Sequence, residues 1–479
     1  MFLLENIYES FCLITPFNRK TAMVSVHKFG GTSVAGPEQF SLVSRIIKDS
    51  CDSQPTESPR PVVVVSAMAG ITNKLYSAIQ AAVVVGDYES ILNEIKTTHF
   101  KCIDKLFVPQ KKFVELLERG IEDDIERIRK LLETITVFGG TCPIEISDII
   151  AGFGEIWSSR ILAQLLVSLE TPARAVNARD FLFLSSSSGK DVRIDWNRSV
   201  APICGSEVLV ITGFLATSSS GVPTTLKRNG SDFSGAIVAN LFNASQLTIW
   251  TDVDGIYSAD PRQISGAKMI TEMSYKEAAE LAYFGAKVIH PQTMAPCVVK
   301  RIPIVLRNTF NLQCPGTLIS GDSILAARAV TMIPEIALIN VEGSGLFGFS
   351  GIAAKLFSAV AAAESNIIMI TQASSEYSIC FAVPIGDAEI CAAAVRKTFA
   401  SEIFEKSIDV TLDTTSCIIA AVGDNMHQQI GLLGRLTSAL GSGGINIRAV
   451  AQGSSERNIT LVVNKADGIK GIQALHDAL

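Results

Sequence analysis

Short apolar runs alternate with longer amphipathic runs from residue 24 to about residue 310. The runs at 61–70 (PVVVVSAMAG), 208–214 (VLVITGF) and 245–255 (SQLTIWTDVDG) are typical of buried strands that end in small or polar loops. The segments at 71–84 and 88–135 are expected to be helical, the second of them charged and amphipathic. This alternation predicts an α/β fold: an open, mostly parallel sheet sandwiched by helices, with ligands at the carboxyl ends of the strands.

The C-terminal part of the chain repeats itself. ITQASSEYSICFAV begins at residue 370 and VAQGSSERNITLVV begins at residue 450, an offset of 80 residues (450 − 370). Each copy has the pattern strand, helix, strand, strand, helix, with a possible closing strand, which predicts two ferredoxin-like βαββαβ modules. The same offset relates Gly351 to Gly431, Leu356 to Leu436, Asn366 to Asn446 and Glu376 to Glu456.

These patterns divide the chain into parts. We expect an α/β domain at 23–312, a linker and first strand region at 313–335, and the two modules at 336–412 and 413–479. Residues 1–22 lack a basic start and their apolar stretch is interrupted by polar residues, so they do not resemble a signal peptide. We expect this extension to be disordered, with Met23 as the working start of the protein.

Composition narrows the class of protein. Hydrophobic residues make up 48% and charged residues 18% of the 479 residues, as in a compact soluble protein. A net charge of −6 gives no reason to expect nucleic acid or an anionic membrane as a partner. The ten cysteines form no CxxC pair, and no apolar run approaches the roughly 18 residues of a membrane-spanning helix. These features predict a cytoplasmic protein without a metal site of its own.

Candidate chemistry gathers where the predicted strands end. Each segment has an ordinary interpretation as a helix cap or turn when taken singly. Together they supply cations, glycine turns and carboxylates at one edge of a sheet, which is what phosphoryl transfer needs. The segments are KFGGTS (28–33), SAMAGITN (66–73), GFGEIWSS (152–159), LKRNGSDFSGA (226–236) and TDVDGIYSADPR (251–262).

Two other motifs carry less weight. The GxGxxG of Gly343, Gly345 and Gly348 has no counterpart in the second copy of the repeat, so a dinucleotide site is not expected. TDVDG lacks the later ligands of a calcium loop.

The chain resembles the aspartate kinases of the amino acid kinase family, whose motifs it carries in the same order from about residue 24. The repeated tail is similar to their paired ACT regulatory domains. Its segments ITQASSEYSI and AQGSSER are most similar to the kinase half of threonine-sensitive bifunctional aspartokinase–homoserine dehydrogenases. The resemblance therefore implies the kinase activity alone. The motifs that carry the resemblance are KFGGTSV, SAMAGITN, GFGE, RNGSDFSGA, TDVDGIYSADPR and YFGAKVIHP.

The resemblance also implies roles for individual residues. Lys28 and Lys287 would neutralise charge on the phosphates, and Asp232 would orient these lysines without removing a proton, because the substrate carboxylate is already ionised. The amides of Gly30 and Gly31 would hold the phosphates, with Mg²⁺ bound to ATP. The nucleotide set is Lys28, Gly30, Gly31, Thr32, Thr251, Asp252, Tyr257, Arg262, Lys287 and Val288.

For L-aspartate, the resemblance assigns Arg228 to the α-carboxylate and Glu155 to the α-ammonium. Hydroxyl contacts would come from Ser66, Thr72 and Ser231. The family motif usually has glycine where Lys227 stands and tyrosine where Phe233 stands. Lys227 adds a positive charge beside the phosphates.

Regulation and assembly are also implied. Gln372 and Gln452 occupy matching points of the repeated QxSSE, and with Asn366 and Asn446 they are candidate effector-binding residues, threonine being the first choice of effector and lysine the second. The alternative is that these glutamines only cap turns. A homodimer or a higher homo-oligomer is expected. Two rival functions remain: a related kinase acting on glutamate, N-acetylglutamate or a nucleotide, and a catalytically silent amino-acid sensor.

The assignment of Arg228 is testable. Arg228→Ala should raise the KM for aspartate strongly and leave the KM for ATP nearly unchanged, since a buried carboxylate loses a charged partner at a cost of roughly 2–5 kcal/mol. Steady-state kinetics with each substrate varied in turn measures both constants. If the KM for ATP rises and that for aspartate does not, Arg228 belongs to the phosphate site.

Overall fold

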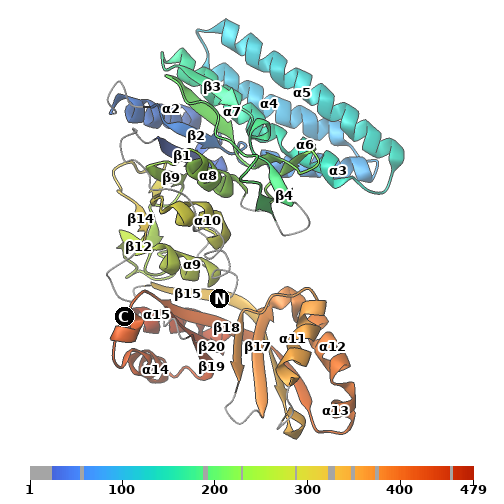
Figure 1. The fold of residues 1–479 in the computed structure, drawn as a ribbon, viewed down its shortest axis with the longest axis vertical. Coiled ribbons are helices and arrows are strands. Elements are labelled where there is room, and N and C mark those ends of the chain that lie inside the picture. The colour runs from blue at the N-terminus through green and yellow to red at the C-terminus, as the bar shows by residue number, and fades with distance from the viewer. Residues whose placement is uncertain are drawn as a thin grey trace.

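The computed structural model describes residues 24–53, 59–186, 192–227, 230–285, 289–321, 329–346, 351–372, 377–453 and 457–479. The extension expected at 1–22 lies outside these ranges. The described chain forms an elongated molecule, with a helix-covered sheet at one end and a second sheet at the other (Figure 1). Within these ranges, none of the helices combines the length and apolar character needed to cross a bilayer.

The N-terminal part is built on an eight-stranded sheet in the order β12-β14-β13-β9-β1-β2-β6-β3. All neighbours in this sheet are parallel except β13 and β14. The predicted open, mostly parallel sheet is therefore confirmed. Its strands are β1 (Ser25–Phe29), β2 (Val62–Val65), β3 (Ala173–Val176), β6 (Val208–Thr212), β9 (Gln246–Thr251), β12 (Glu272–Ser274), β13 (Ile304–Asn308) and β14 (Thr317–Ser320).

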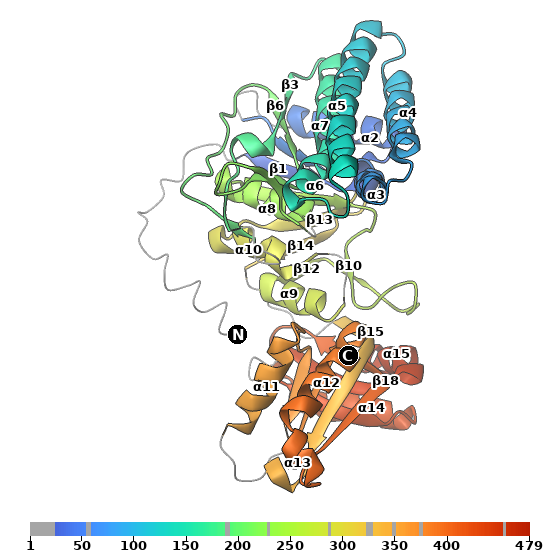
Figure 2. The ribbon, with the colours of Figure 1, turned by 90° about the vertical axis from the view of Figure 1, so that its right-hand side faces the viewer.

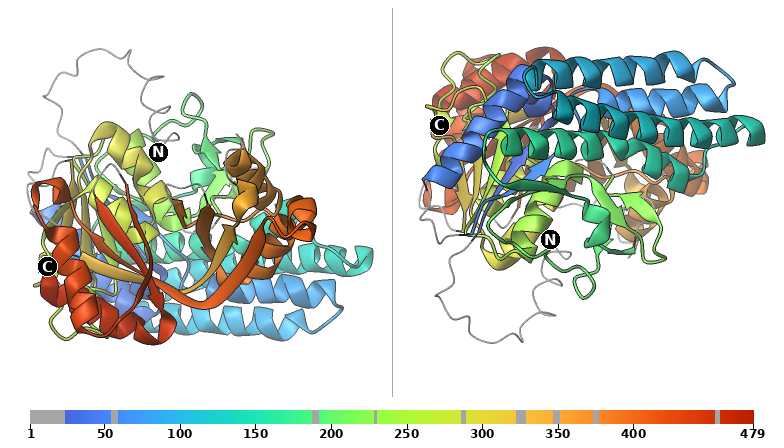
Figure 3. Two further views of the ribbon diagram at one scale, coloured as in Figure 1. Left: turned by 90° about the horizontal axis from the view of Figure 1, so that it is seen from below. Right: turned by 90° about the horizontal axis from the view of Figure 1, so that it is seen from above.

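Helices cover both faces of this sheet, which explains the unbroken valine run of β2. Val62 and Val64 pack into the core beneath α8 and α10, whereas Val63 and Val65 pack into the core beneath α2, α3 and α7. The long helices α4 and α5 lie side by side (Figure 3). The helices are α2 (Pro37–Asp52), α3 (Ile71–Val83), α4 (Tyr88–Leu106), α5 (Lys111–Phe138), α6 (Ile144–Ala151), α7 (Phe153–Ser168), α8 (Gly230–Leu241), α9 (Tyr275–Tyr283) and α10 (Pro291–Lys300).

Within the described residues, three two-stranded sheets complete this part. β7 and β8 form a hairpin that leads toward α8, and β10 pairs with β11 in the loop region after β9. The pairs are β4 (Leu184–Ser186) with β5 (Arg193–Ile194), β7 (Leu215–Thr217) with β8 (Pro223–Thr225), and β10 (Ile256–Tyr257) with β11 (Met269–Ile270).

The C-terminal repeat forms one antiparallel six-stranded sheet in the order β16-β17-β15-β18-β20-β19. Helices α11 to α15 pack on one face of this sheet (lower part of Figure 1). The elements are β15 (Ala329–Glu342), α11 (Ile352–Ala362), β16 (Met369–Gln372), β17 (Ser378–Pro384), α12 (Ala388–Thr398), α13 (Ala400–Phe404), β18 (Asp409–Val422), α14 (Leu432–Ser442), β19 (Ile447–Gln452), β20 (Asn458–Asn464) and α15 (Gly468–Ala478).

The long strands β15 and β18 each run through both copies of the repeat (Figure 2). Residues 336–342 of β15 pair with β17, and residues 338–342 pair with 409–413 of β18, which completes the first copy. Residues 329–333 pair with 418–422 of β18 and so supply the closing strand of the second copy. The boundary expected at 412/413 falls inside β18, and β14, within the expected linker region, belongs to the first sheet.

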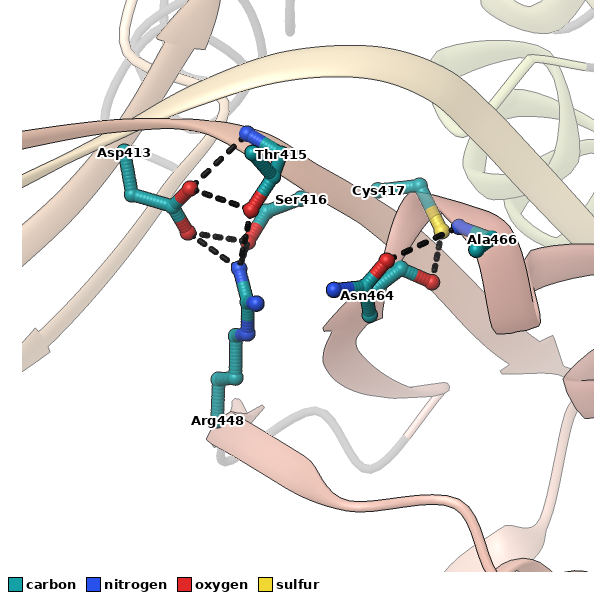
Figure 4. A network of polar contacts seen from close by, with 7 residues as sticks. All are labelled: Asp413, Thr415, Ser416, Cys417, Arg448, Asn464 and Ala466. Carbon is teal, nitrogen blue, oxygen red and sulfur yellow. Dashed lines mark hydrogen bonds and ion pairs between the residues drawn. The ribbon is translucent and has the colours of Figure 1, made fainter.

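A polar network holds β18 where it passes from one copy to the other (Figure 4). The Asp413 carboxylate accepts hydrogen bonds from the Thr415 amide at 2.8 Å and the Ser416 hydroxyl at 2.7 Å, and it forms an ion pair with Arg448 of β19. Burial works toward raising the pKa of Asp413, but these hydrogen bonds and Arg448 outweigh it and lower the pKa. These contacts thus connect this part of β18 to β19, the edge strand of the second copy.

Candidate active site

The candidate active site begins at the carboxyl end of β1. Lys28 is buried, with its side chain 7% exposed, and its Nζ lies 2.5 Å from Asp232 Oδ1 in the first turn of α8. Gly235 allows this approach, since a Cβ added there would lie only 3.0 Å from Lys28 Cβ. The predicted contact between Lys28 and Asp232 is therefore present in the structure.

A cavity of about 280 Å³ lies beside this ion pair. It collects the small turn after β2, the start of α7 and the start of α8, which lie far apart in the sequence. The predicted residues that line it are Gly31, Ser66, Thr72, Glu155, Ser231 and Asp232, together with Lys227.

Glu155 is the buried carboxylate of this cavity. It lies in the first turn of α7, and its neighbour Gly154 packs so closely on Ala67 that an added Cβ would lie 2.6 Å from the alanine Cβ. Burial raises the pKa of Glu155 to about 8, although amide hydrogen bonds from Ala67 and Glu155 and the charge of Arg179 oppose the shift. Among the described residues, Glu155 Oε2 has no hydrogen-bond partner. This oxygen is available to a donor on a bound ligand.

The glycine turn after β1 contacts the neighbouring strand β9. The Gly30 amide donates to the carbonyl of Trp250 in β9 at 3.2 Å, so it is already engaged and does not point freely toward a phosphate. The role of the Gly30 amide in holding the phosphates stays a prediction. Gly31 lines the cavity, and Thr32 is exposed at the start of the short helix Gly31–Val34.

The predicted nucleotide loop after β9 lies outside the cavity lining. Thr251 ends β9, and its carbonyl accepts the amide of Thr309 at 2.8 Å; the Thr309 hydroxyl in turn contacts Ser33 of the glycine turn at 2.7 Å. Asp252 accepts a hydrogen bond from the Thr251 hydroxyl at 3.2 Å. Tyr257 belongs to β10, and Arg262 is 85% exposed beside Asp260. The structure thus brings Thr251 and Asp252 near the glycine turn and leaves Arg262 in solvent.

Three predicted residues, Arg228, Lys287 and Val288, lie outside the described residues. The sequence interpretation also missed some polar groups. Asp254, in the loop after β9, accepts hydrogen bonds from the side-chain amides of Asn308 at 2.7 Å and Asn311 at 3.1 Å. Asn308 ends β13, beside Thr251 in the strand register, so its place at a strand end was the available signal. In the described parts of the chain, no group of three or more His, Cys, Asp or Glu side chains is arranged to hold a metal ion.

The arrangement combines a fixed cation paired with a carboxylate, a buried carboxylate with a free oxygen, and several hydroxyls around one cavity. Such a site has groups for an amino acid's ammonium and for a transferring phosphoryl group.

Comparison with known proteins shows which family this chain belongs to. Residues 23–308 match the amino acid kinase family, and residues 339–399 and 419–479 match the ACT domain. The chain is 38% identical over 474 residues to bifunctional aspartokinase/homoserine dehydrogenase 1, chloroplastic, of Zea mays, covering 95% of this chain and 50% of the relative. It is 30% identical to aspartokinase 3, chloroplastic, of Arabidopsis thaliana, covering 95% and 81% of the two chains.

Solved structures agree with this relationship. E. coli aspartokinase III in complex with aspartate and ADP, in the R-state, has a TM-score of 0.77 and 25% identity, covering 95% of this chain and 99% of that one. The same enzyme with lysine and aspartate, in the T-state, has a TM-score of 0.72 at the same identity and coverage. The chain spans about half the length of the bifunctional relatives that it matches.

The raised pKa of Glu155 predicts how stability depends on pH. Between pH 4.5 and about pH 8 the folded protein keeps a proton that the unfolded chain has released, so the free energy of unfolding should fall as pH rises through this window. Glu155→Gln removes this titration. Urea unfolding at several pH values should therefore show Glu155→Gln gaining stability relative to wild type as pH rises.

The matched control is Glu145→Gln, which changes an exposed carboxylate on the preceding helix. Its difference from wild type should vary far less across the same pH range. Parallel curves for wild type and Glu155→Gln would contradict the protonated, buried state of Glu155.

Proposed function

This chain belongs to the aspartokinase branch of the amino acid kinase family, and we propose that it is an ATP-dependent aspartate kinase. A side-chain carboxylate oxygen of L-aspartate attacks the γ-phosphorus of ATP, the bond to the β,γ-bridging oxygen breaks, and 4-phospho-L-aspartate and ADP are formed. The observation that carries the proposal is the single cavity that joins the unpartnered Glu155 Oε2 to the Lys28–Asp232 ion pair.

The described residues suit these steps. Lys28 is a buried cation whose position Asp232 restrains, so it is placed to offset charge on the transferring group without reorganisation. Glu155 would accept a hydrogen bond from the α-ammonium of L-aspartate, and Ser66, Thr72 and Ser231 would add hydroxyl contacts. Arg228 for the α-carboxylate and Lys287 for the phosphates remain proposals from the motif. Mg²⁺ would arrive with ATP and offset phosphate charge.

The reaction would be the first step toward lysine and diaminopimelate, threonine and methionine. We further propose that the protein acts in the cytoplasm, although the plant relatives carry the description chloroplastic. The solved neighbour bound to aspartate and ADP supports the pair of substrates. Aspartate-dependent activity is also what separates this proposal from a glutamate, N-acetylglutamate or nucleotide kinase and from a silent sensor.

A coupled assay of ADP release with aspartate, with glutamate and with no acceptor tests the function. Release that requires aspartate supports the proposal. Release with glutamate instead indicates the related kinase, and an absence of acceptor-dependent release with intact amino-acid binding indicates the sensor.

The role of Lys28 gives a sharper expectation. Lys28→Ala should lower kcat by roughly 100-fold or more, the scale of losing one transition-state donor, and change the KM for ATP much less. The control is Lys96→Ala, which removes an ammonium 3.9 Å from Glu122 on the helical layer and should leave kcat near wild type. A Lys28→Ala enzyme with near-normal kcat would contradict the assignment.

The tail is proposed to bind an amino-acid effector. Gln372 ends β16 and Gln452 ends β19; these two edge strands of the sheet lie near one another, and both glutamines are exposed. Asn366 and Asn446 are also exposed, just before the same strands. Threonine is the first choice of effector; lysine is the second and is bound with aspartate in a solved neighbour. A homodimer through the ACT sheets is part of the proposal.

Gln372→Ala or Gln452→Ala should raise the inhibitory concentration several-fold while basal kcat stays within about twofold, a change of order 1–2 kcal/mol in coupling. The reason is that an effector inhibits only if it binds the low-activity arrangement more tightly. Titration of wild type and both variants with threonine and lysine measures this. Wild type insensitive to both amino acids, or variants with full sensitivity, would show that the proposed effector site is wrong.

A further inference from the structure

Lys227 lines the active-site cavity but has no role in the reaction described above. It follows β8 of the hairpin and precedes α8, whose first residue donates its Gly230 amide to the Lys227 carbonyl at 3.1 Å. Its Nζ lies 2.8 Å from Asp148 Oδ2, and its side chain remains 28% exposed. Lys227 is therefore a cation at the wall of the cavity. Asp148 holds its ammonium, and part of its side chain remains exposed.

The backbone at Lys227 is unfavourable for a residue with a side chain. Its φ of +60° lies in the left-handed region, which glycine adopts at far lower cost. A lysine in this conformation carries a local strain that glycine would avoid, which gives a reason to ask what its side chain contributes.

Neutralising Asp148 is not a sufficient reason for the lysine. Asp148 lies in α6, is 3% exposed, and accepts hydrogen bonds from the Thr224 hydroxyl at 2.7 Å and the Thr225 hydroxyl at 3.1 Å. Arg179 lies close enough to donate to the Asp148 backbone carbonyl at 3.0 Å, which brings a further positive charge to the same region. Asp148 does not line the cavity, whereas Lys227 does. The Asp148 carboxylate thus holds the Lys227 ammonium from a position outside the cavity lining.

The cavity is therefore lined by an acidic residue and a basic residue from two elements. Glu155 on α7 offers an unpartnered carboxylate oxygen, and Lys227 after β8 offers an ammonium that has three N–H donors, of which Asp148 takes one. An α-amino acid carries an ammonium and a carboxylate on one carbon. Its ammonium favours the ionised form of Glu155 on binding, and the Lys227 ammonium complements its carboxylate.

We propose that Lys227 is a further specificity-determining residue, whose ammonium binds the α-carboxylate of the amino-acid substrate in addition to the cation that the motif assigns to it, and that Asp148 is the positioning residue that holds it. The proposal rests on the proposed aspartate kinase function and deepens it. Lys227 acts on binding and not on phosphoryl transfer, so its loss changes the KM for the amino acid and leaves kcat largely intact.

Lys227→Gly tests the proposal. Glycine relieves the strained φ but leaves the buried Asp148 without its cation, so thermal melting is measured beside the kinetics, and Lys227→Gly/Asp148→Asn removes the uncompensated charge. The KM for aspartate should rise at least about tenfold, a loss of about 1.4 kcal/mol of binding, with kcat and the KM for ATP within about twofold. Lys227→Arg, which keeps the charge, should restore most of the affinity. Asp148→Asn should raise the KM for aspartate less, and Lys227→Gly/Asp148→Asn should equal Lys227→Gly alone.

A binding measurement separates this inference from the proposed function. Succinate has two carboxylates and no ammonium, and its affinity for wild type and Lys227→Gly is measured directly by calorimetry. A parallel loss of succinate and aspartate affinity supports the assignment. Wild type that binds succinate through Lys227 but shows no aspartate-dependent ADP release refutes the function and leaves the carboxylate site standing. An unchanged succinate affinity and an unchanged KM for aspartate in Lys227→Gly overturn the inference, as does a raised KM for ATP alone.

Discussion

The approach of α8 to β1 is the constraint on which the site depends. Gly235 lets the helix come close enough for Asp232, in its first turn, to reach the buried Nζ of Lys28. The same approach places Gly230 and Ser231 against the turn after β2, and so closes one side of the cavity. A Cβ at position 235 would press on the side chain of Lys28 and would disturb both the ion pair and this side of the cavity. The packing of α8 on β1 and the Lys28–Asp232 ion pair therefore both depend on the absence of a side chain at position 235.

Much of the fold was predictable because burial leaves a direct mark on the sequence. The valine run of β2 is apolar at every position since both faces of its sheet are covered, and this pattern is typical of a parallel sheet. The repeat was visible as a fixed offset between similar segments. The closing strand of the second copy was not predictable in this way, because it lies before the first copy in the sequence.

The candidate site was predictable where a motif carries the chemistry. Glu155, Asp232 and Lys28 follow from short segments at strand ends, and the structure brings them to one cavity region. The anchor of Lys227 was not predictable, because Asp148 lies 79 residues away on a helix and the contact exists only through tertiary packing. The partner of the Gly30 amide was not predictable for a similar reason: the Trp250 carbonyl belongs to a strand more than 200 residues further along the chain.

The shared strands of the C-terminal sheet have a consequence for synthesis of the protein. Ala329 pairs with Val422, a separation of 93 residues (422 − 329), so the first half of β15 leaves the ribosome well before its partner in β18 exists. Until then it presents an unpaired edge that another nascent chain can use for pairing. The strands of the first copy are complete once residue 413 has emerged, so this copy can fold before residues 418–422 appear. The strand that closes the second copy, residues 329–333, is therefore synthesised before the first copy.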